Sequence, residues 1–69
     1  MINRIVEIYR GSEVFGKIEV FSNAITWSAT AISGTAESLL DTFSDDAFDE
    51  IASGKREVAD RGFTLKVTS

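Results

Sequence analysis

The chain has 69 residues, with seven Lys and Arg against eleven Asp and Glu, so its formal net charge at neutral pH is −4. This length predicts one domain, residues 1–69, and the negative charge argues against direct binding to nucleic acid or to anionic lipid. The absence of Cys and His excludes disulfides, thiolate metal sites and both Ser-His and Cys-His nucleophile pairs. Charges at Arg4 and Glu7 argue against a secretory signal, and the longest uncharged stretch, residues 20–36, is too polar to span a bilayer. We therefore expect a cytoplasmic protein.

The first half of the chain predicts three strands. Residues 2–10 are rich in Ile, Val and Tyr, and residues 11–13 supply a hairpin turn. Residues 14–21 alternate with period two. Their two predicted faces are Val14, Ile18 and Val20 on one side, and Phe15, Lys17, Glu19 and Phe21 on the other. Residues 25–30 also alternate, with hydroxyl side chains on one face, and predict a third strand.

The second half predicts two helices and a closing strand. A short helix follows residues 33–35, because its apolar positions recur with helical spacing. These positions are Ala36, Leu39, Leu40 and Phe43. Ser44 predicts the N-cap of a second helix that ends near Gly62, with Gly54 as a point where it could divide in two. Residues 63–68 alternate and predict a strand.

These elements predict an α+β domain in the order β-β-β-α-α-β. A small antiparallel sheet of three to four strands would carry both helices on one face. The alternative order is β-β-α-α-β, in which residues 24–34 are irregular or helical.

The sequence predicts binding rather than catalysis. It has no Walker loop and no GxGxxG fingerprint, and its glycines are too isolated to cradle a phosphate. A domain of this size has little room for the cleft that paired catalytic carboxylates need. We expect no catalytic residue, no cofactor and no metal.

Six of the eleven acids lie within residues 37–50, and no base lies between Lys17 and Lys55. The candidate partner-binding residues are Glu37, Asp41, Asp45, Asp46, Asp49 and Glu50. One interpretation is ordinary helix stabilisation, with acids in the first half of the second helix and bases (Lys55, Arg56 and Arg61) in its second half. That interpretation leaves two features unexplained: an acid at the end of the first helix, and the like-charged pair Asp45 and Asp49.

An external cation would relieve this repulsion. A metal ion fits poorly, since the acidic run lacks the alternating ligands and the Gly of a calcium loop. A basic protein surface fits better. Fourteen residues would span at most ~20 Å if all were helical, and the break near Ser44 makes this an upper bound. That span gives one carboxylate per ~3.4 Å, and one strand of duplex DNA carries one charge per ~3.4 Å of its axis.

In outline, the chain resembles small phage-encoded anti-CRISPR proteins that inhibit type I systems. The resemblance rests on its length and on three segments: the hairpin IVEIYRGSEVFGKIEVF, the acidic run ESLLDTFSDDAFDE and the closing strand GFTLKVTS. It implies an inhibitor that works in the host cytoplasm. The inhibitor would occupy the DNA-binding face of a CRISPR effector by mimicking the charge of DNA.

A second hypothesis belongs to another class. Phe15 and Phe21 share a predicted strand face, so they could form an apolar patch. The chain would then be a small phage structural or assembly domain that oligomerises through this face. The sequence does not fix the oligomeric state.

Overall fold

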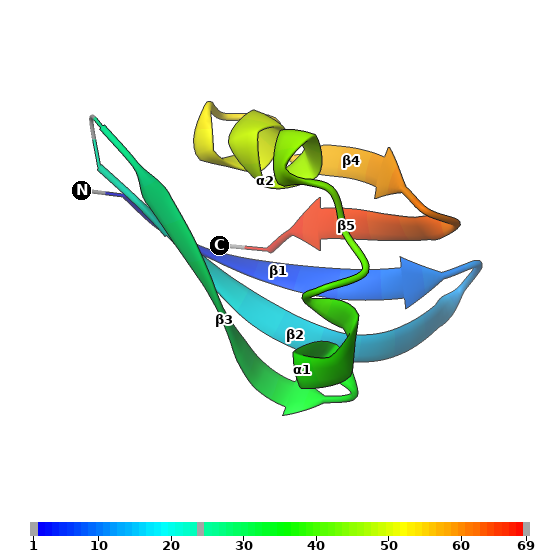
Figure 1. The fold of residues 1–69 in the computed structure, drawn as a ribbon. Helices are drawn as coiled ribbons and strands as arrows, with labels where there is room; N and C mark the ends of the chain where they lie inside the picture. Colours follow the sequence, from blue (N-terminus) through cyan, green and yellow to red (C-terminus); the bar gives the residue numbers. More distant parts are fainter. Residues whose placement is uncertain (1, 24, 69) are drawn as a thin grey trace.

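Alternating apolar side chains build a five-stranded antiparallel sheet, and the connection across it carries both helices. The computed structural model describes residues 2–23 and 25–68. Its elements are β1 (Ile2–Arg10), β2 (Glu13–Ser22), β3 (Trp27–Gly34), α1 (Ala36–Leu39), α2 (Asp45–Ala52), β4 (Glu57–Asp60) and β5 (Phe63–Val67). The α+β class predicted from the sequence is confirmed, with one strand more than expected (Figure 1).

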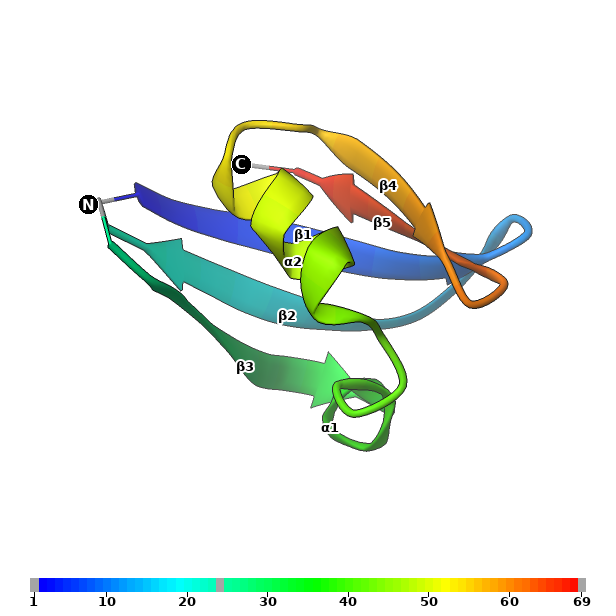
Figure 2. The same ribbon diagram turned by 45° about the horizontal axis from the view of Figure 1, so that its top comes forward.

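The strand order β3-β2-β1-β5-β4 explains why one face is covered. β3 and β4 are consecutive strands in the chain, yet they lie at opposite edges of the sheet. The chain between them must cross the sheet, and it does so as α1 and α2 (Figure 2). α1 packs on β3 and β2, whereas α2 packs on β4, β2 and β3.

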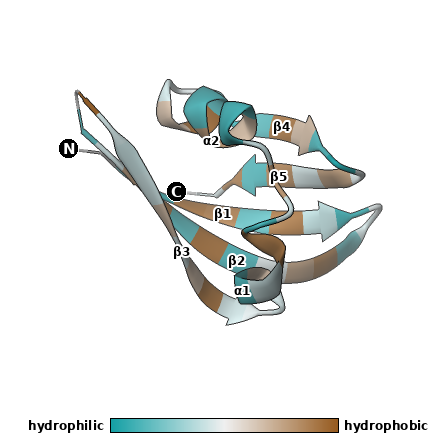
Figure 3. Cartoon of the chain, viewed as in Figure 1, coloured by the Kyte–Doolittle hydropathy of each residue, from teal (hydrophilic) through white to brown (hydrophobic). Residues whose placement is uncertain are grey.

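The core lies between the sheet and these two helices. Brown apolar bands alternate with paler and teal ones along β1 and β2, as period two requires (Figure 3). The buried apolar residues are Val6, Ile8, Ile18, Val20, Ala36, Phe43, Ala47, Phe48, Ile51, Val58, Leu65 and Val67. Among the described residues, no helix lies on the opposite face of the sheet (Figure 1).

A β-bulge reverses part of the predicted alternation in β2. Ile8 lies opposite Gly16 and Tyr9 lies opposite Val14, so Phe15 is the extra residue. The bulge turns the Phe15 ring toward the core, where its centroid lies 5.8 Å from that of Phe63. Val14 is 47% exposed. The predicted faces of Val14 and Phe15 are therefore wrong, while Ile18 and Val20 are buried as predicted.

The third strand exists, but it lies slightly later than predicted. Trp27–Gly34 pairs with β2, whereas Ile25 precedes the strand and is 94% exposed. Residue 24 lies outside the described residues. The alternative order without a third strand is wrong.

The predicted long second helix is wrong in its second half. α2 ends at Ala52, the chain turns at Gly54, and Glu57–Asp60 forms β4 against β5. Arg61 and Gly62 both have positive φ, 53° and 83°, and they form the two-residue turn between Asp60 and Phe63. Two successive positive φ angles match the right-handed twist of a hairpin, which explains why the chain forms β4–β5 here.

Candidate functional site

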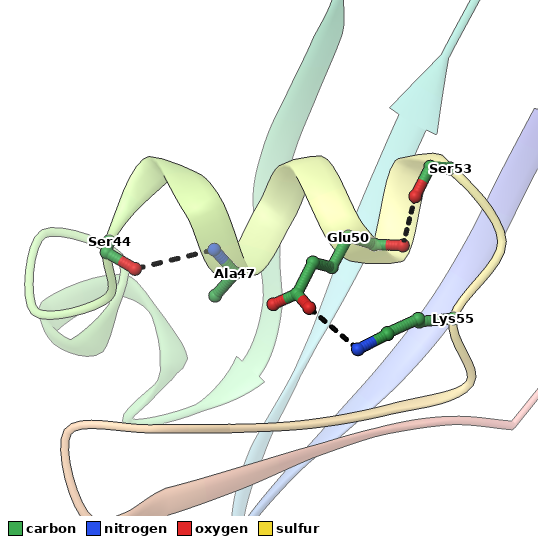
Figure 4. A network of polar contacts seen from close by, with 5 residues as sticks. All are labelled: Ser44, Ala47, Glu50, Ser53 and Lys55. Carbon is green, nitrogen blue, oxygen red and sulfur yellow. Dashed lines mark hydrogen bonds and ion pairs between the residues drawn. The ribbon is translucent and has the colours of Figure 1, made fainter.

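Helix α2 is fixed at its start by two side chains. The Ser44 Oγ accepts a hydrogen bond from the backbone N–H of Ala47, so Ser44 is the N-cap, as the sequence predicts (Figure 4). The carboxylate of Asp60, at the end of β4, accepts bonds from the Ser44 backbone N–H (2.9 Å) and from its hydroxyl (3.2 Å). These two bonds tie the N-cap residue to the end of β4. They therefore hold α2 against β4 and set its orientation over the sheet.

The buried face of α2 determines where its acids lie. Ala47, Phe48 and Ile51 are buried in the core, so the remaining positions of the helix face outward. Asp45, Asp46 and Asp49 are exposed, and Glu50 is half-buried. Glu37 is exposed in the first turn of α1, and Asp41 is exposed in the turn after it.

The six predicted residues therefore do not form one straight line. They are divided between α1, α2 and the turn that joins them, so the ~20 Å helical span predicted from the sequence is not present as a single helix. Glu50 is also engaged, since its Oε1 lies 2.8 Å from the Nζ of Lys55 (Figure 4). In the part of the chain that the structure describes, none of the other five acids has an ion pair.

The interpretation of the acids as dipole compensation is only partly correct. Asp45 and Asp46 lie in the first turn of α2, where the helix dipole favours acids. The last turn has no base, because Lys55, Arg56 and Arg61 all lie beyond the helix. Asp49 and Glu50 thus lie in the half of the helix that the dipole makes unfavourable.

Asp49 has a partner that the sequence did not suggest. Its carboxylate accepts a hydrogen bond from the indole Nε1 of Trp27, the first residue of β3. The indole ring also lies on Phe48, with the two ring centroids 4.9 Å apart. Trp27 is therefore half-buried between β3 and α2 and links them.

Two grooves flank Trp27 along the boundary between β3 and the helices. The larger, about 340 Å³, is lined by two acids, Asp41 and Asp45, and by the apolar residues Trp27, Ala29, Leu40, Phe43 and Phe48. The smaller, about 200 Å³, lies on the other side of Trp27 and includes Asp49. Three of the six acids, Asp41, Asp45 and Asp49, thus line grooves that share the side chain of Trp27.

This arrangement suits an amphipathic cation. A Lys or Arg side chain can lay its aliphatic stem on apolar rings while its charged end reaches a carboxylate. The larger groove offers both surfaces together. Within residues 2–23 and 25–68, no three Asp or Glu side chains converge closely enough to hold a metal ion.

The uncovered sheet face differs from the predicted apolar patch. Phe21 is exposed there, but Phe15 is not on this face. The centre of the face is a polar network in which Glu7 accepts a hydrogen bond from the Tyr9 hydroxyl (2.8 Å) and lies 3.9 Å from the Nζ of Lys17. The surface available for apolar association is therefore smaller than the sequence suggested.

Sequence reasoning identified the acids but missed the apolar part of the site. Phe43 is buried in the core, whereas Trp27 is only partly buried at its edge, where it borders the grooves. The available signal was the spacing of Trp27 and Ala29 on one face of the third strand, beside the Leu40 and Phe43 of the next segment. Their meeting depends on the path from β3 to α2, which no local pattern encodes.

No helix in the described part of the chain combines the length and the apolar character needed to cross a membrane. Comparison of the chain with protein-family models, with curated proteins and with solved structures gives no match.

Proposed function

We propose that this protein binds a basic protein surface through the acidic groove between β3 and α2. The observation that carries the proposal is the position of Asp41 and Asp45, which are exposed beside the apolar floor of the larger groove. Neither has a basic partner among the described residues. A partner that supplied Lys or Arg would relieve the repulsion among these acids and cover the half-buried indole of Trp27.

The most specific form of the proposal is an inhibitor in the host cytoplasm. Its carboxylates would occupy the DNA-binding face of a nucleic-acid-binding complex, in particular a type I CRISPR effector. The support is the resemblance in length and charge described above, together with the exposure of Glu37, Asp41, Asp45 and Asp46. This function needs no catalytic residue and no cofactor.

The test is a competition assay with a purified type I effector and its target DNA. The variant Asp41→Asn/Asp45→Asn/Asp46→Asn removes three negative charges and leaves the bond between Asp49 and Trp27 intact. The matched control, Glu13→Gln/Glu19→Gln/Glu57→Gln, changes net charge equally on other surfaces. The wild type should block DNA binding, and the groove variant should need at least about tenfold more protein for the same effect. Inhibition should also weaken as salt rises.

Circular dichroism would establish that both variants remain folded. Equal loss of inhibition in the two variants would mean that inhibition depends on the net charge of the protein and not on the acids of the groove. If the wild type does not inhibit the effector, the inhibitor form is wrong. Capture of partners from a bacterial lysate, with both variants in parallel, would then show whether another basic protein loses its binding in the groove variant alone.

A second candidate is self-association through the uncovered sheet face. Phe21 is 37% exposed on this face, and Val14 and Ile32 are also exposed. Self-association predicts a sedimentation coefficient that rises with protein concentration and depends little on salt. In Phe21→Ser the coefficient should no longer change with concentration. Phe15→Ser, by contrast, should act through stability, because its ring packs on Phe63.

A further inference from the structure

The two edges of the sheet are built differently. β4 has four residues, begins with Glu57 and ends with Asp60, and such short, charged edges resist pairing with another strand. β3 has eight residues (WSATAISG) with no charge and no Pro. An uncharged edge of this length presents alternate backbone N–H and C=O groups as a template for another strand.

The open part of this edge is its first half. A register shift occurs where Ile18 pairs with Ala31 and Lys17 with Ser33, so Ile32 is an extra residue in β3. α1 packs against β3 after this shift, as the chain continues through Gly34 and Thr35 (Figure 1). Residues 27–31 therefore form the regular segment that another strand could join.

The same segment borders the acidic grooves. Trp27 and Ala29 of β3 are part of the larger groove, and Trp27 also belongs to the smaller one. In an added strand, every second side chain would point to the helix side of the sheet, with successive ones roughly 7 Å apart. Those side chains would lie over the grooves, next to Asp41, Asp45 and Asp49.

We infer that the β3 edge at residues 27–31 accepts an extended, basic segment of a partner protein as a sixth strand, with its Lys or Arg side chains in the grooves beside Trp27. This inference rests on the proposed function and specifies how the partner binds. Backbone bonds would supply the pairing, and alternate side chains would supply specificity. A second copy of this chain is a poorer occupant, because antiparallel pairing of two β3 edges would place the acids of both copies on the same side of the joined sheet.

The probe is a short synthetic peptide in which Lys alternates with Val or Thr, compared with one in which Glu replaces each Lys. Trp27 is the only tryptophan in the chain, so its fluorescence reports occupancy of either groove. The Lys peptide should change this fluorescence in a saturable way and the Glu peptide should not. Asp41→Asn/Asp45→Asn should weaken binding of the Lys peptide by about tenfold.

Backbone pairing is tested with two further peptides of the same sequence. One is N-methylated at its even positions and the other at its odd positions, so composition and charge are the same. Only alternate N–H groups of an added strand face its neighbour. One of the two peptides should therefore lose about tenfold or more in affinity and the other should bind normally. Amide exchange should slow at alternate residues of 27–31, with β4 as the internal control.

Three results would overturn the inference, and the first two would leave the proposed function standing. Equal binding of the two N-methylated peptides would mean that charge alone holds the ligand, and the acidic groove would stand without the added strand. No fluorescence change with the Lys peptide, combined with a successful competition assay, would place the partner on the exposed carboxylates away from β3. Self-association that protects the amides of residues 27–31 would show that a second copy occupies this edge.

Discussion

The indole Nε1 of Trp27 donates a hydrogen bond to the carboxylate of Asp49, and this bond joins edge strand β3 to helix α2. The two residues are 22 positions apart in the chain. The bond uses one of the acids that would otherwise be free to meet a partner. It also holds the indole ring between the two grooves, where the ring of Phe48 packs against it.

Breaking this bond should destabilise the domain modestly. We expect Asp49→Ala and Trp27→Phe each to lower the free energy of unfolding by about 1 kcal/mol, which is below the roughly 1.5–3 kcal/mol of a bond to a charged group because both groups meet solvent. The double variant should cost less than the sum of the two single variants. Urea denaturation measures all three. Strict additivity would show that the two side chains do not interact in solution.

The hydrogen bonds that fix the start of α2 should contribute as much to the stability of the domain as the bond between Trp27 and Asp49. Ser44→Ala removes the N-cap oxygen, and Asp60→Asn weakens the two bonds that hold Ser44 in place. We expect a loss of about 1 kcal/mol for each. Asp46→Asn is the control, because it changes charge in the same turn of the helix without touching the cap. Loss of stability in Asp46→Asn that equals that of Ser44→Ala would contradict this role for the cap.

The wrong prediction around β4 has a local cause. Val58 and Ala59 continue the helical spacing set by Phe48 and Ile51, and the same two residues also fit a strand. Gly54, with φ 120°, ends the helix, and the turn at Arg61 and Gly62 makes the hairpin. A positive φ at Arg61 is not encoded by its residue type, so the sequence alone did not distinguish the helix from the strand.

The candidate site was predictable as composition but not as geometry. The exposure of Asp45 and Asp46 follows from the apolar face of α2, which the spacing of Phe48 and Ile51 indicates. The pairing of Asp49 with Trp27 requires β3 to lie beside α2, a consequence of the crossing from one sheet edge to the other. The inward turn of Phe15 depends on a bulge set by pairing with β1, which the alternation within β2 cannot reveal.

Close packing at Gly16 gives a third prediction. A Cβ on Gly16 would lie 2.6 Å from the carbonyl oxygen of Ser33 and 3.0 Å from the backbone nitrogen of Ala36. Both atoms are backbone, so neither can move without shifting the end of β3 or the start of α1. Gly16→Ala should therefore cost about 1–3 kcal/mol, as overpacking typically does.

A substitution of the other glycine in the β1–β2 hairpin shows whether the loss of stability comes from this clash or from any change of a glycine there. Gly11 lies in the β1–β2 turn with φ 63°, where an added Cβ would meet nothing within 4 Å. Asn tolerates this left-handed conformation better than most residues, so Gly11→Asn should change stability far less. Thermal unfolding of the two variants compares them. An equal loss in both would show that the close approach of β2 to β3 and α1 is absent.

The polar network on the uncovered sheet face predicts a shifted titration. The hydrogen bond from the Tyr9 hydroxyl to Glu7, together with desolvation and the negative charge of Glu7, raises the pKa of Tyr9 above its ordinary value of 10.0. Lys66 lies over the Tyr9 ring, 4.8 Å from its centroid, and Lys17 lies 3.9 Å from Glu7, so both cations oppose the effect. The pKa should therefore fall in Glu7→Gln, which removes the charge and weakens the acceptor.

The sign of the linked stability follows from this shift. Because the folded state holds the phenol proton more tightly, the stability that Tyr9 adds is complete below pH 10.0 and is lost as the pH rises through the folded pKa. Tyr9 is the only tyrosine, so ultraviolet titration of the folded protein measures its ionisation directly. Glu19→Gln removes a charge from the same face, opposite Ile5 in the ladder, and should leave the curve closer to the wild type. A lower midpoint in Glu19→Gln than in Glu7→Gln would show that the general field of the face, rather than the bond to Glu7, controls the Tyr9 proton.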